Sequence, residues 1–189
     1  MSETKTLNDS QLREIYDEPK DLVRNAYAFS LEDTTKRFLK ACSFVVISST
    51  NQDGYLDISP RGGEPGFISI IDDNHIAFLD KRGNNKIQTL TNLVTNPRVG
   101  LMFMIPGVPE VVRAYGDAKV IVDDEKLLSM GGNPKRDKSI ISIKITKLFP
   151  HCGAAINHAG LWKSDSWINN EKADVPSLME MALSLAKNR

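Results

Sequence analysis

Short β-strand patterns follow one another from residue 44 to residue 149, and this run constrains the fold more than any other feature of the chain. β-Branched and aromatic residues alternate or cluster there between turn signals, as in a β-rich domain. One clear helical stripe, from Ile87 to Val94, lies among them. The chain shows neither a regular strand–helix alternation nor a G-x-G-x-x-G sequence, which disfavours a Rossmann domain and predicts a mostly β fold, a largely antiparallel barrel with flanking helices. The expected strands cover residues 44–50, 55–59, 67–71, 75–80, 98–105, 110–122 and 139–149.

Local signals refine this barrel. Gly116 lies in the middle of a long strand pattern and is expected to mark a bulge or bend. The segment 98–105 is almost continuously apolar, which predicts a strand buried on both faces. Asp72-Asp73-Asn74 predicts a hairpin turn, and Asn96-Pro97 is expected to end the helix.

Helical patterns flank the strands at both ends. Leu12 and Leu22 belong to helical stripes near the N-terminus, and Asp33 is expected to cap a third helix. We expect these helices to pack against the larger body. The last residues predict a polar turn and an amphipathic helix. A length of 189 residues suits one domain. Its expected parts are a helical region at 1–42, the barrel at 43–150 and a helical tail at 151–189.

Charge and cysteine content disfavour several classes of function. Lys+Arg and Asp+Glu both number 24, so there is no electrostatic footprint for nucleic acid or an anionic membrane. No apolar run approaches the roughly 18 residues that span a bilayer, and the polar N-terminus lacks a secretory apolar core, so we expect a cytoplasmic protein. Cys42 and Cys152 form no CxxC pair, and His151 with His158 does not complete a zinc ligand spacing, so no metal site is predicted.

Basic and polar residues gather around two neighbouring strand ends. Arg61 and Lys86 lie at those ends, and Gly83, Asn84 and Asn85 lie where a helix is expected to begin, with Lys86 in its first turn. Free N–H groups and the positive end of a helix dipole attract an anion, and Arg and Lys complete its cage. The segment therefore predicts a phosphate site. The alternative is a glycine-rich loop with ordinary surface charges.

The order of these elements resembles a known family. The segments ISPRG, FLDKRGNNK, NPRVGLMF and VVRAYGDAKV, in this order, are similar to those of the pyridoxamine 5′-phosphate oxidase-like split-barrel flavoproteins over roughly residues 38–162. Within that superfamily, ISPRGGEPGF, NPRVGLMFMIPG and PHCGAAINHAGLW resemble a subfamily assigned as FMN-dependent enzymes. The resemblance implies a split β-barrel of the FMN-binding type, non-covalent FMN as cofactor, and a homodimer with FMN at the subunit interface.

The resemblance also implies roles for individual residues. The family's first phosphate-binding Arg falls on Arg61, and its segment F-x-T-x-x-G-x-R-K aligns with residues 78–86, so Lys86 matches the phosphate-binding Lys. Asp80 stands where Thr is usual and Asn85 where Arg is usual, which removes one positive charge from the clamp. The cations that could restore this charge are Lys81, Arg82 and Arg113.

A flavin needs a phosphate clamp, backbone donors for its ring and an apolar wall. Arg61 supplies the clamp together with Lys86, and the loop 62–66 allows close backbone approach because it is rich in glycine. Trp162 either forms the wall or seals the barrel end. Arg113 is either an inward cation near the phosphate or an exposed cross-strand partner. The predicted cofactor-binding residues are Arg61, Gly62, Leu79, Asp80, Asn84, Asn85, Lys86, Arg113 and Trp162.

Three hypotheses of function remain open at this point. The first is an FMN-dependent oxidoreductase with a small-molecule substrate or electron donor, in which the flavin carries the electrons. The second is a flavin-binding or redox-sensing protein without turnover, and the third is a haem- or F420-binding split barrel. No catalytic acid, base or nucleophile can be identified. The segment INHAGLWKSDSW shows no counterpart of the substrate-binding basic residues of the pyridoxamine phosphate oxidases, which disfavours vitamin B6 oxidation.

Overall fold

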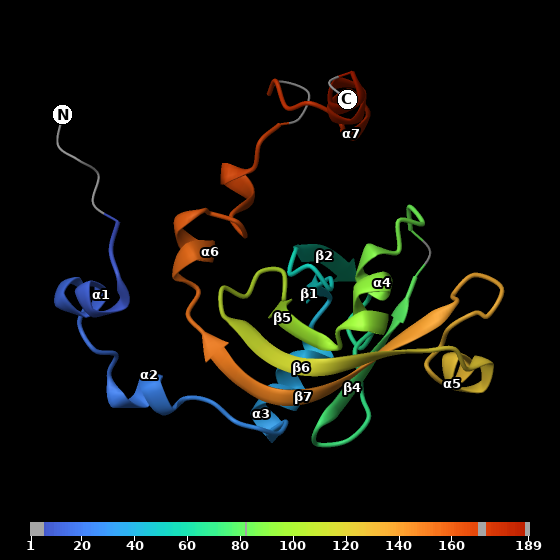
Figure 1. Cartoon of the computed structure of the whole chain (residues 1–189), viewed down its shortest axis with the longest axis horizontal. Helices are drawn as coiled ribbons and strands as arrows, with labels where there is room; N and C mark the ends of the chain where they lie inside the picture. Colours follow the sequence, from blue (N-terminus) through green and yellow to red (C-terminus); the bar gives the residue numbers. More distant parts are fainter. Residues whose placement is uncertain (1–5, 82, 170–172, 188–189) are drawn as a thin grey trace.

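A single antiparallel sheet forms the body of the protein. The computed structural model describes residues 6–81, 83–169 and 173–187. Within these residues a seven-stranded sheet has the order β2-β1-β5-β6-β7-β4-β3. This confirms the predicted mostly β architecture with flanking helices (Figure 1). The strands are β1 (Phe44–Thr50), β2 (Leu56–Gly62), β3 (Ser69–Ile70), β4 (His75–Asp80), β5 (Arg98–Met104), β6 (Val111–Ile121) and β7 (Ser139–His151).

The sheet curls so that distant strands of its order approach each other. β2 lies at one end of the order and β4 near the other, yet Nη2 of Arg61 in β2 lies 3.5 Å from Oδ1 of Asp80 in β4. Helix α4 (Gln88–Thr95) packs on β1, β2 and β6. Its buried Asn92 donates from Nδ2 to Oγ of Ser49 on β1, at 3.0 Å. Curling and helix packing together bring β2, β4 and the start of α4 to one end of the barrel.

Aliphatic and aromatic side chains fill the interior. Phe78 and Phe103 are fully buried in one cluster. The alternation of Ile141, Ile143 and Ile145 with polar residues puts all three in that cluster, because alternate side chains of a strand face the same side. Burial of an apolar side chain of this size stabilises the fold by roughly 1.5–3 kcal/mol.

Gly116 marks a bulge, as predicted. The register between β6 and β7 shifts between Tyr115 and Gly116. A Cβ atom at Gly116 would lie 2.5 Å from the backbone oxygen of Lys144, closer than any side chain tolerates. Glycine therefore allows β7 to approach at the point where the sheet bends.

β5 differs from its prediction. Val99, Leu101 and Phe103 face the core, but Arg98 is exposed and Met102 keeps 37% of its surface exposed. The expectation of burial on both faces is therefore wrong within one chain. The strand has one covered face, and on the other face Met104 is buried while Met102 stays partly exposed.

Two helical arms project from the barrel. α1 (Asp9–Ile15) and α2 (Asp21–Asn25) contain no buried residue, and Figure 1 shows both standing away from the sheet. The expectation that these helices pack against the body is wrong within one chain. The C-terminal arm also leads away from the barrel, and none of its helical residues is buried. It consists of α6 (Ala154–His158), the 3₁₀ turn η1 (Ser164–Ser166) and α7 (Leu178–Ala186).

The remaining N-terminal helix, α3 (Asp33–Ala41), packs on the barrel through the fully buried Leu39. Its N-cap is Glu32, and no side chain caps it, so the predicted cap Asp33 is the first helical residue instead. No helix within the described residues is long and apolar enough to cross a membrane. The assignment of the whole chain to one domain stays a prediction.

Candidate functional site

A cavity of about 720 Å³ lies between β2, the end of β4 and the start of α4. The structure brings all predicted cofactor-binding residues to its wall except Arg113 and Trp162. Residues from strands that are far apart in the sheet order meet here because the sheet curls. The predicted residues on the cavity wall are Arg61, Gly62, Leu79, Asp80, Asn84, Asn85 and Lys86.

Arg61 reaches the cavity through the alternation of β2. Asp57, Ser59 and Arg61 are partly covered, whereas the residues between them are exposed, so these three side chains share the cavity face. Arg61 donates from Nη1 to the Ser59 hydroxyl and, at 3.0 Å, to the backbone oxygen of Pro60. Its Nε is buried and has no hydrogen-bond partner among the described residues. The guanidinium is thus held in place and keeps one unused donor.

Asp80 stands beside this guanidinium. Its Oδ1 lies 3.5 Å from Nη2 of Arg61, and the two side chains are 22% and 21% exposed. Burial raises the pKa of the Asp80 carboxyl, and the positive charge of Arg61 opposes that rise. The Asp80 carboxylate therefore occupies the place beside Arg61 that an anionic ligand would take to contact the same guanidinium.

The segment between β4 and α4 is a loop, not a helical turn. α4 begins at Gln88, its N-cap is Ile87, and no side chain caps it. The backbone N–H of Lys86 donates to Oδ1 of Asn84 at 3.0 Å. The prediction that Lys86 lies in the first helical turn is therefore wrong. The uncapped helix start lies on the cavity wall, so its first N–H groups are available to an anion.

Backbone strain in this loop coincides with the cavity. Asn85 and Ile87 have φ angles of 58° and 44°, in the left-handed region. Asn tolerates this region, but a β-branched residue there is strained. Strain of this kind clusters at ligand sites, where the surrounding structure imposes it.

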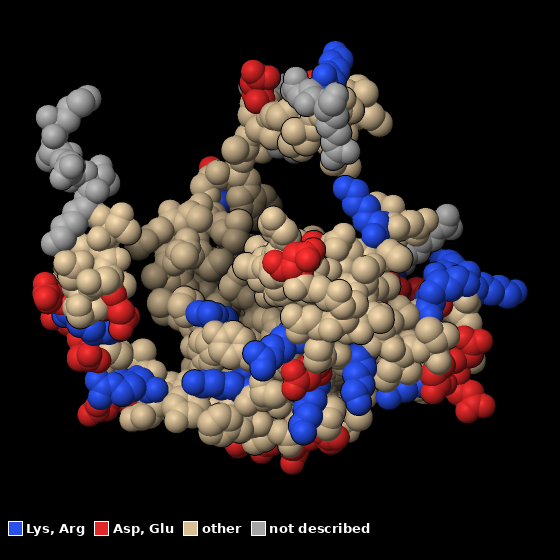
Figure 2. Space-filling view, in the orientation of Figure 1, with Lys and Arg blue, Asp and Glu red and all other residues tan. Residues whose placement is uncertain are grey.

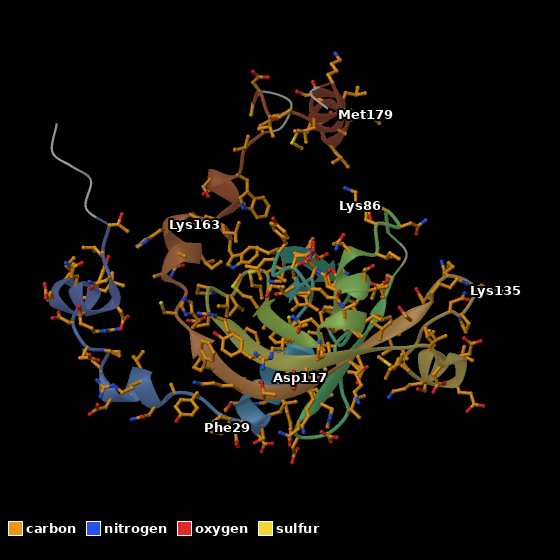
Figure 3. All side chains as sticks on the ribbon, viewed as in Figure 1. Phe29, Lys86, Asp117, Lys135, Lys163 and Met179 are labelled. Carbon is orange, nitrogen blue, oxygen red and sulfur yellow. The ribbon has the colours of Figure 1, made fainter. Side chains whose placement is uncertain are left out.

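A basic loop that the sequence analysis did not assign to the site completes the cavity. Lys135, Arg136 and Lys138 lie between α5 (Asp124–Ser129) and β7, and they line the same cavity. Figure 2 shows Lys and Arg side chains at the places where Figure 3 labels Lys86 and Lys135, and others spread over the rest of this face. The charged run was visible in the sequence. Its position at the cavity depends on the pairing of β7 with β4, and no local sequence pattern indicates that pairing.

Positive charge predominates on the cavity wall. Arg61 pairs with Asp80, and Oδ2 of Asp57 accepts a hydrogen bond from the Thr89 hydroxyl at 2.9 Å. The other cations of the wall form no salt bridge with a described residue. Arg82, one of the cations considered for the clamp, lies outside the described residues. The cations without a salt bridge are Lys81, Lys86, Lys135, Arg136 and Lys138.

Ser139 adds a second unused polar atom. It lies at the start of β7 opposite Asp80, and it lines the cavity. Its hydroxyl oxygen is buried and has no hydrogen-bond partner among the described residues. Arg61 Nε and Ser139 Oγ are the buried side-chain atoms of the described chain with this property, and both belong to one cavity.

Arg113 and Trp162 are held elsewhere within the chain. Arg113 Nη2 donates to the Tyr115 hydroxyl at 3.4 Å, and its guanidinium carbon lies 4.8 Å from the ring centroid of Phe149. This is the cross-strand arrangement, since Arg113 and Phe149 are register partners on β6 and β7. Trp162 donates from Nε1 to the backbone oxygen of Val108 at 3.0 Å. Within one chain neither side chain reaches the cavity wall.

Gly63 allows Phe67 to pack beside the cavity. A Cβ atom at Gly63 would lie 2.7 Å from Cβ of Phe67, so this glycine is needed for packing of Phe67 against the loop.

Histidine does not contribute to the cavity wall. His75 contacts the carboxylate of Asp72 at 2.9 Å, and no histidine lines the cavity within the described chain. No group of three or more His, Cys, Asp or Glu side chains in the described ranges is placed to hold a metal ion.

Comparisons with known proteins place this cavity in a family context. The family model described as "Pyridoxamine 5′-phosphate oxidase" matches residues 31–152, which include every strand of the sheet. No curated protein matches the chain.

Solved structures share the fold. A protein from Lactobacillus delbrueckii assigned to the pyridoxamine 5′-phosphate oxidases has a TM-score of 0.51 at 20% identity, over 65% of this chain and 95% of that one. HupZ from Group A Streptococcus has a TM-score of 0.51 at 15% identity, over 64% and 99%.

Proposed function

Since this chain belongs to the pyridoxamine 5′-phosphate oxidase family, we propose that it binds FMN in the cavity between β2, β4 and α4 and acts as an FMN-dependent oxidoreductase on a small molecule. The observation that carries the proposal is the pair of unused buried polar atoms, Arg61 Nε and Ser139 Oγ, in one cavity. A buried donor without a partner is costly, so an acceptor brought within reach of these atoms would remove that cost.

The residues present suit a terminal phosphate. Arg61 and Lys86 offer charge-assisted donors, and the uncapped start of α4 offers backbone N–H groups. Leu79 and Phe67 give the same cavity an apolar part. When bound, FMN would supply the electron transfer, while these residues bind and orient it.

Asp80 sets a condition on this binding. Its carboxylate faces Arg61, so a phosphate must share the guanidinium with it. Protonation of Asp80 removes the competing charge, and its raised pKa favours the protonated form relative to an ordinary Asp. Asp80 therefore puts a negative charge beside the residues that we propose for the phosphate. The affinity for FMN then depends on whether the Asp80 carboxyl is protonated.

We place the cofactor site in a homodimer, because the single chain leaves large apolar surfaces uncovered and members of this family are commonly dimers. Leu22 in the N-terminal arm is 83% exposed, and Leu178 in the C-terminal arm is 79% exposed. A second copy that covers these arms would remove apolar surface from water. Arg113 and Trp162 would then contact the flavin of the partner subunit.

Two other functions stay as alternatives. A flavin-binding or redox-sensing protein would use the same cavity without turnover. A haem in this cavity would find no imidazole from the same chain, since no histidine of the described chain lines it. A deazaflavin such as F420 would meet the same cations, so only the identity of the bound cofactor separates it from FMN.

The identity of the cofactor tests the proposal. The absorption spectrum of the purified protein is recorded, the cofactor is released by heat, and its mass is measured. We expect a flavin spectrum and the mass of FMN; haem, a deazaflavin or riboflavin would overturn the assignment. Steady-state oxidation of NADH or NADPH with an added acceptor then separates an oxidoreductase from a protein that only holds its flavin.

A further inference from the structure

The loop between β4 and α4 contains a helix-capping hydrogen bond that is not followed by a helical turn. The backbone N–H of Lys86 donates to Oδ1 of Asn84 at 3.0 Å, which is the bond that an N-cap side chain forms with the second residue of a helix. A helix capped by Asn84 would begin at Asn85, yet α4 begins at Gln88. The segment from Asn85 to Ile87 therefore lies where a first helical turn is expected after such a cap.

Backbone angles keep this segment out of the helix. Asn85 and Ile87 have φ angles of 58° and 44°, whereas a right-handed helix needs a φ of roughly −60°. The left-handed conformation is unfavourable for L-residues, and most of all for a β-branched one such as Ile87. The backbone oxygen of Ile87 already accepts the N–H of Thr91 at 2.9 Å, as it would inside a helix. A change of backbone angles at Asn85 and Ile87 would thus lengthen α4 without a new cap.

An anion in the flavin cavity would favour the longer helix. The free N–H groups of a first helical turn attract an anion, and the side chain of Lys86 adds a positive charge. An independent observation indicates a ligand in the same place. Ser139 is only 5% exposed, it lines the cavity, and its hydroxyl has no hydrogen-bond partner among the described residues. The loop residues on the cavity wall are Asn84, Asn85, Lys86 and Ile87.

We propose that residues 84–87 form a conformational switch with two states, the left-handed loop of this structure and a first turn of α4, and that a bound phosphate group selects the helical state. In that state Asn84 is the N-cap and Lys86 lies in the first helical turn. Because the phosphate binds the helical state more tightly, the stability of the loop state sets part of the affinity. The identity of the phosphate as that of FMN rests on the proposed function, whereas the change of conformation does not.

Nuclear magnetic resonance of the isotope-labelled full chain tests the switch, because Cα shifts and amide–Hα couplings report φ. Spectra are recorded without ligand and with saturating FMN, riboflavin or inorganic phosphate. We expect positive φ at Asn85 and Ile87 without ligand and with riboflavin, and helical angles with FMN. Left-handed angles that persist with bound FMN overturn the proposal, as do helical angles before any ligand is added or with riboflavin. If FMN does not bind, the proposed function falls, and the response to inorganic phosphate alone decides the switch.

Ile87→Gly shows whether the switch sets the affinity. Glycine removes the steric cost of the left-handed angle and disfavours the helix, so the loop state gains stability. We expect the melting temperature without ligand to rise by about 2 °C and the dissociation constant for FMN to rise about fivefold, with riboflavin binding unchanged. Val122→Gly, at an exposed β-branched residue outside the cavity, is the matched control and should leave both affinities unchanged. Equal FMN affinity in the two variants, or an equal loss of riboflavin affinity in Ile87→Gly, would refute the switch.

Discussion

Asp80 lies 3.5 Å from the guanidinium that we assign to the flavin phosphate, and its carboxylate competes with a phosphate for the same donors. An ordinary phosphate clamp contains no such acid. At the residue scale, the affinity of the cavity for FMN therefore depends on two competing ion pairs of Arg61. One is formed with Asp80 and the other with the phosphate of the ligand. Both partners are about four-fifths covered, so solvent screens this balance only in part.

Replacing Asp80 by Asn should strengthen FMN binding. The variant removes the competing charge and keeps a side chain of similar size, so we expect a dissociation constant about fivefold lower at neutral pH, of the order of 1 kcal/mol. Quenching of flavin fluorescence on titration measures it. Asp72→Asn, in the exposed turn between β3 and β4, is the control and should leave the constant unchanged. A weaker affinity in Asp80→Asn would contradict the competition.

The raised pKa of Asp80 also gives a pH dependence with a definite sign. Burial raises this pKa above the value in the unfolded chain, and Arg61 only reduces the rise. Relative to Asp80→Asn, the stability of wild-type protein is therefore highest below the unfolded pKa and falls as the pH rises through the folded pKa. Melting temperatures of the two proteins across the acidic range check this. A difference that grows in the opposite direction would show that the ion pair outweighs burial.

Lys86→Ala should weaken FMN binding more than Lys81→Ala. Lys86 belongs to the loop whose backbone is fixed by Asn84, on the wall of the flavin cavity. Lys81 is shared between this cavity and a second one of about 490 Å³ beside it. Loss of one charge-assisted contact corresponds to about tenfold in the dissociation constant. Parallel fluorescence titrations measure both variants. Indistinguishable constants would remove the special role of Lys86.

At the scale of elements, the bulge of β6 decides whether the sheet can bend. Gly116→Ala would place a methyl group 2.5 Å from the Lys144 backbone oxygen, so we expect the free energy of unfolding to fall by about 2 kcal/mol. Gly83→Ala is the matched control, because no atom lies within 4 Å of its added Cβ. Chemical denaturation measures both. Equal stability of the two variants would show that β7 can move away without cost.

Strand periodicity made much of the fold predictable. The alternation of Ile141 and Ile143 and the glycine at position 116 are local signals, and the structure confirms both. The predicted start of α4 is too early because the left-handed conformations of Asn85 and Ile87 delay the helix. Asn is enriched in that region, but no propensity indicates it for the β-branched Ile87. β5 was predicted to be buried on both faces because an apolar residue such as Met102 has the same sequence signal whether it is buried or partly exposed.

The sequence predicts only those residues of the candidate site that lie in a recognisable sequence segment. Arg61 and Lys86 were found because each sits in a recognisable segment, and the curled sheet brings them to one cavity. Arg136 and Ser139 were not found, since their place at the cavity follows from the long-range pairing of β7 with β4. As long as the strand order is unknown, the sequence does not indicate which part of the barrel a charged segment before a strand lies next to.

At the scale of the whole molecule, the exposed apolar residues of the two arms, such as Leu22 and Leu178, favour assembly. We expect a homodimer whose stability is linked to the flavin. A ligand that binds only the dimer stabilises it by about 2.7 kcal/mol at a hundred times its dissociation constant. Removing FMN should therefore lower the melting temperature and shift sedimentation toward monomer at low concentration. A monomer that retains stoichiometric FMN would show that the site lies within one chain.

The most direct test of the central claim is the affinity of wild-type protein and Arg61→Ala for FMN and riboflavin, which differ only in the phosphate. The account predicts that wild-type protein binds FMN roughly tenfold to a hundredfold more tightly than riboflavin, and that Arg61→Ala loses most of this difference while Arg37→Ala keeps it. Riboflavin binding as tightly as FMN to wild-type protein would contradict the phosphate clamp, and with it the assignment of the cavity.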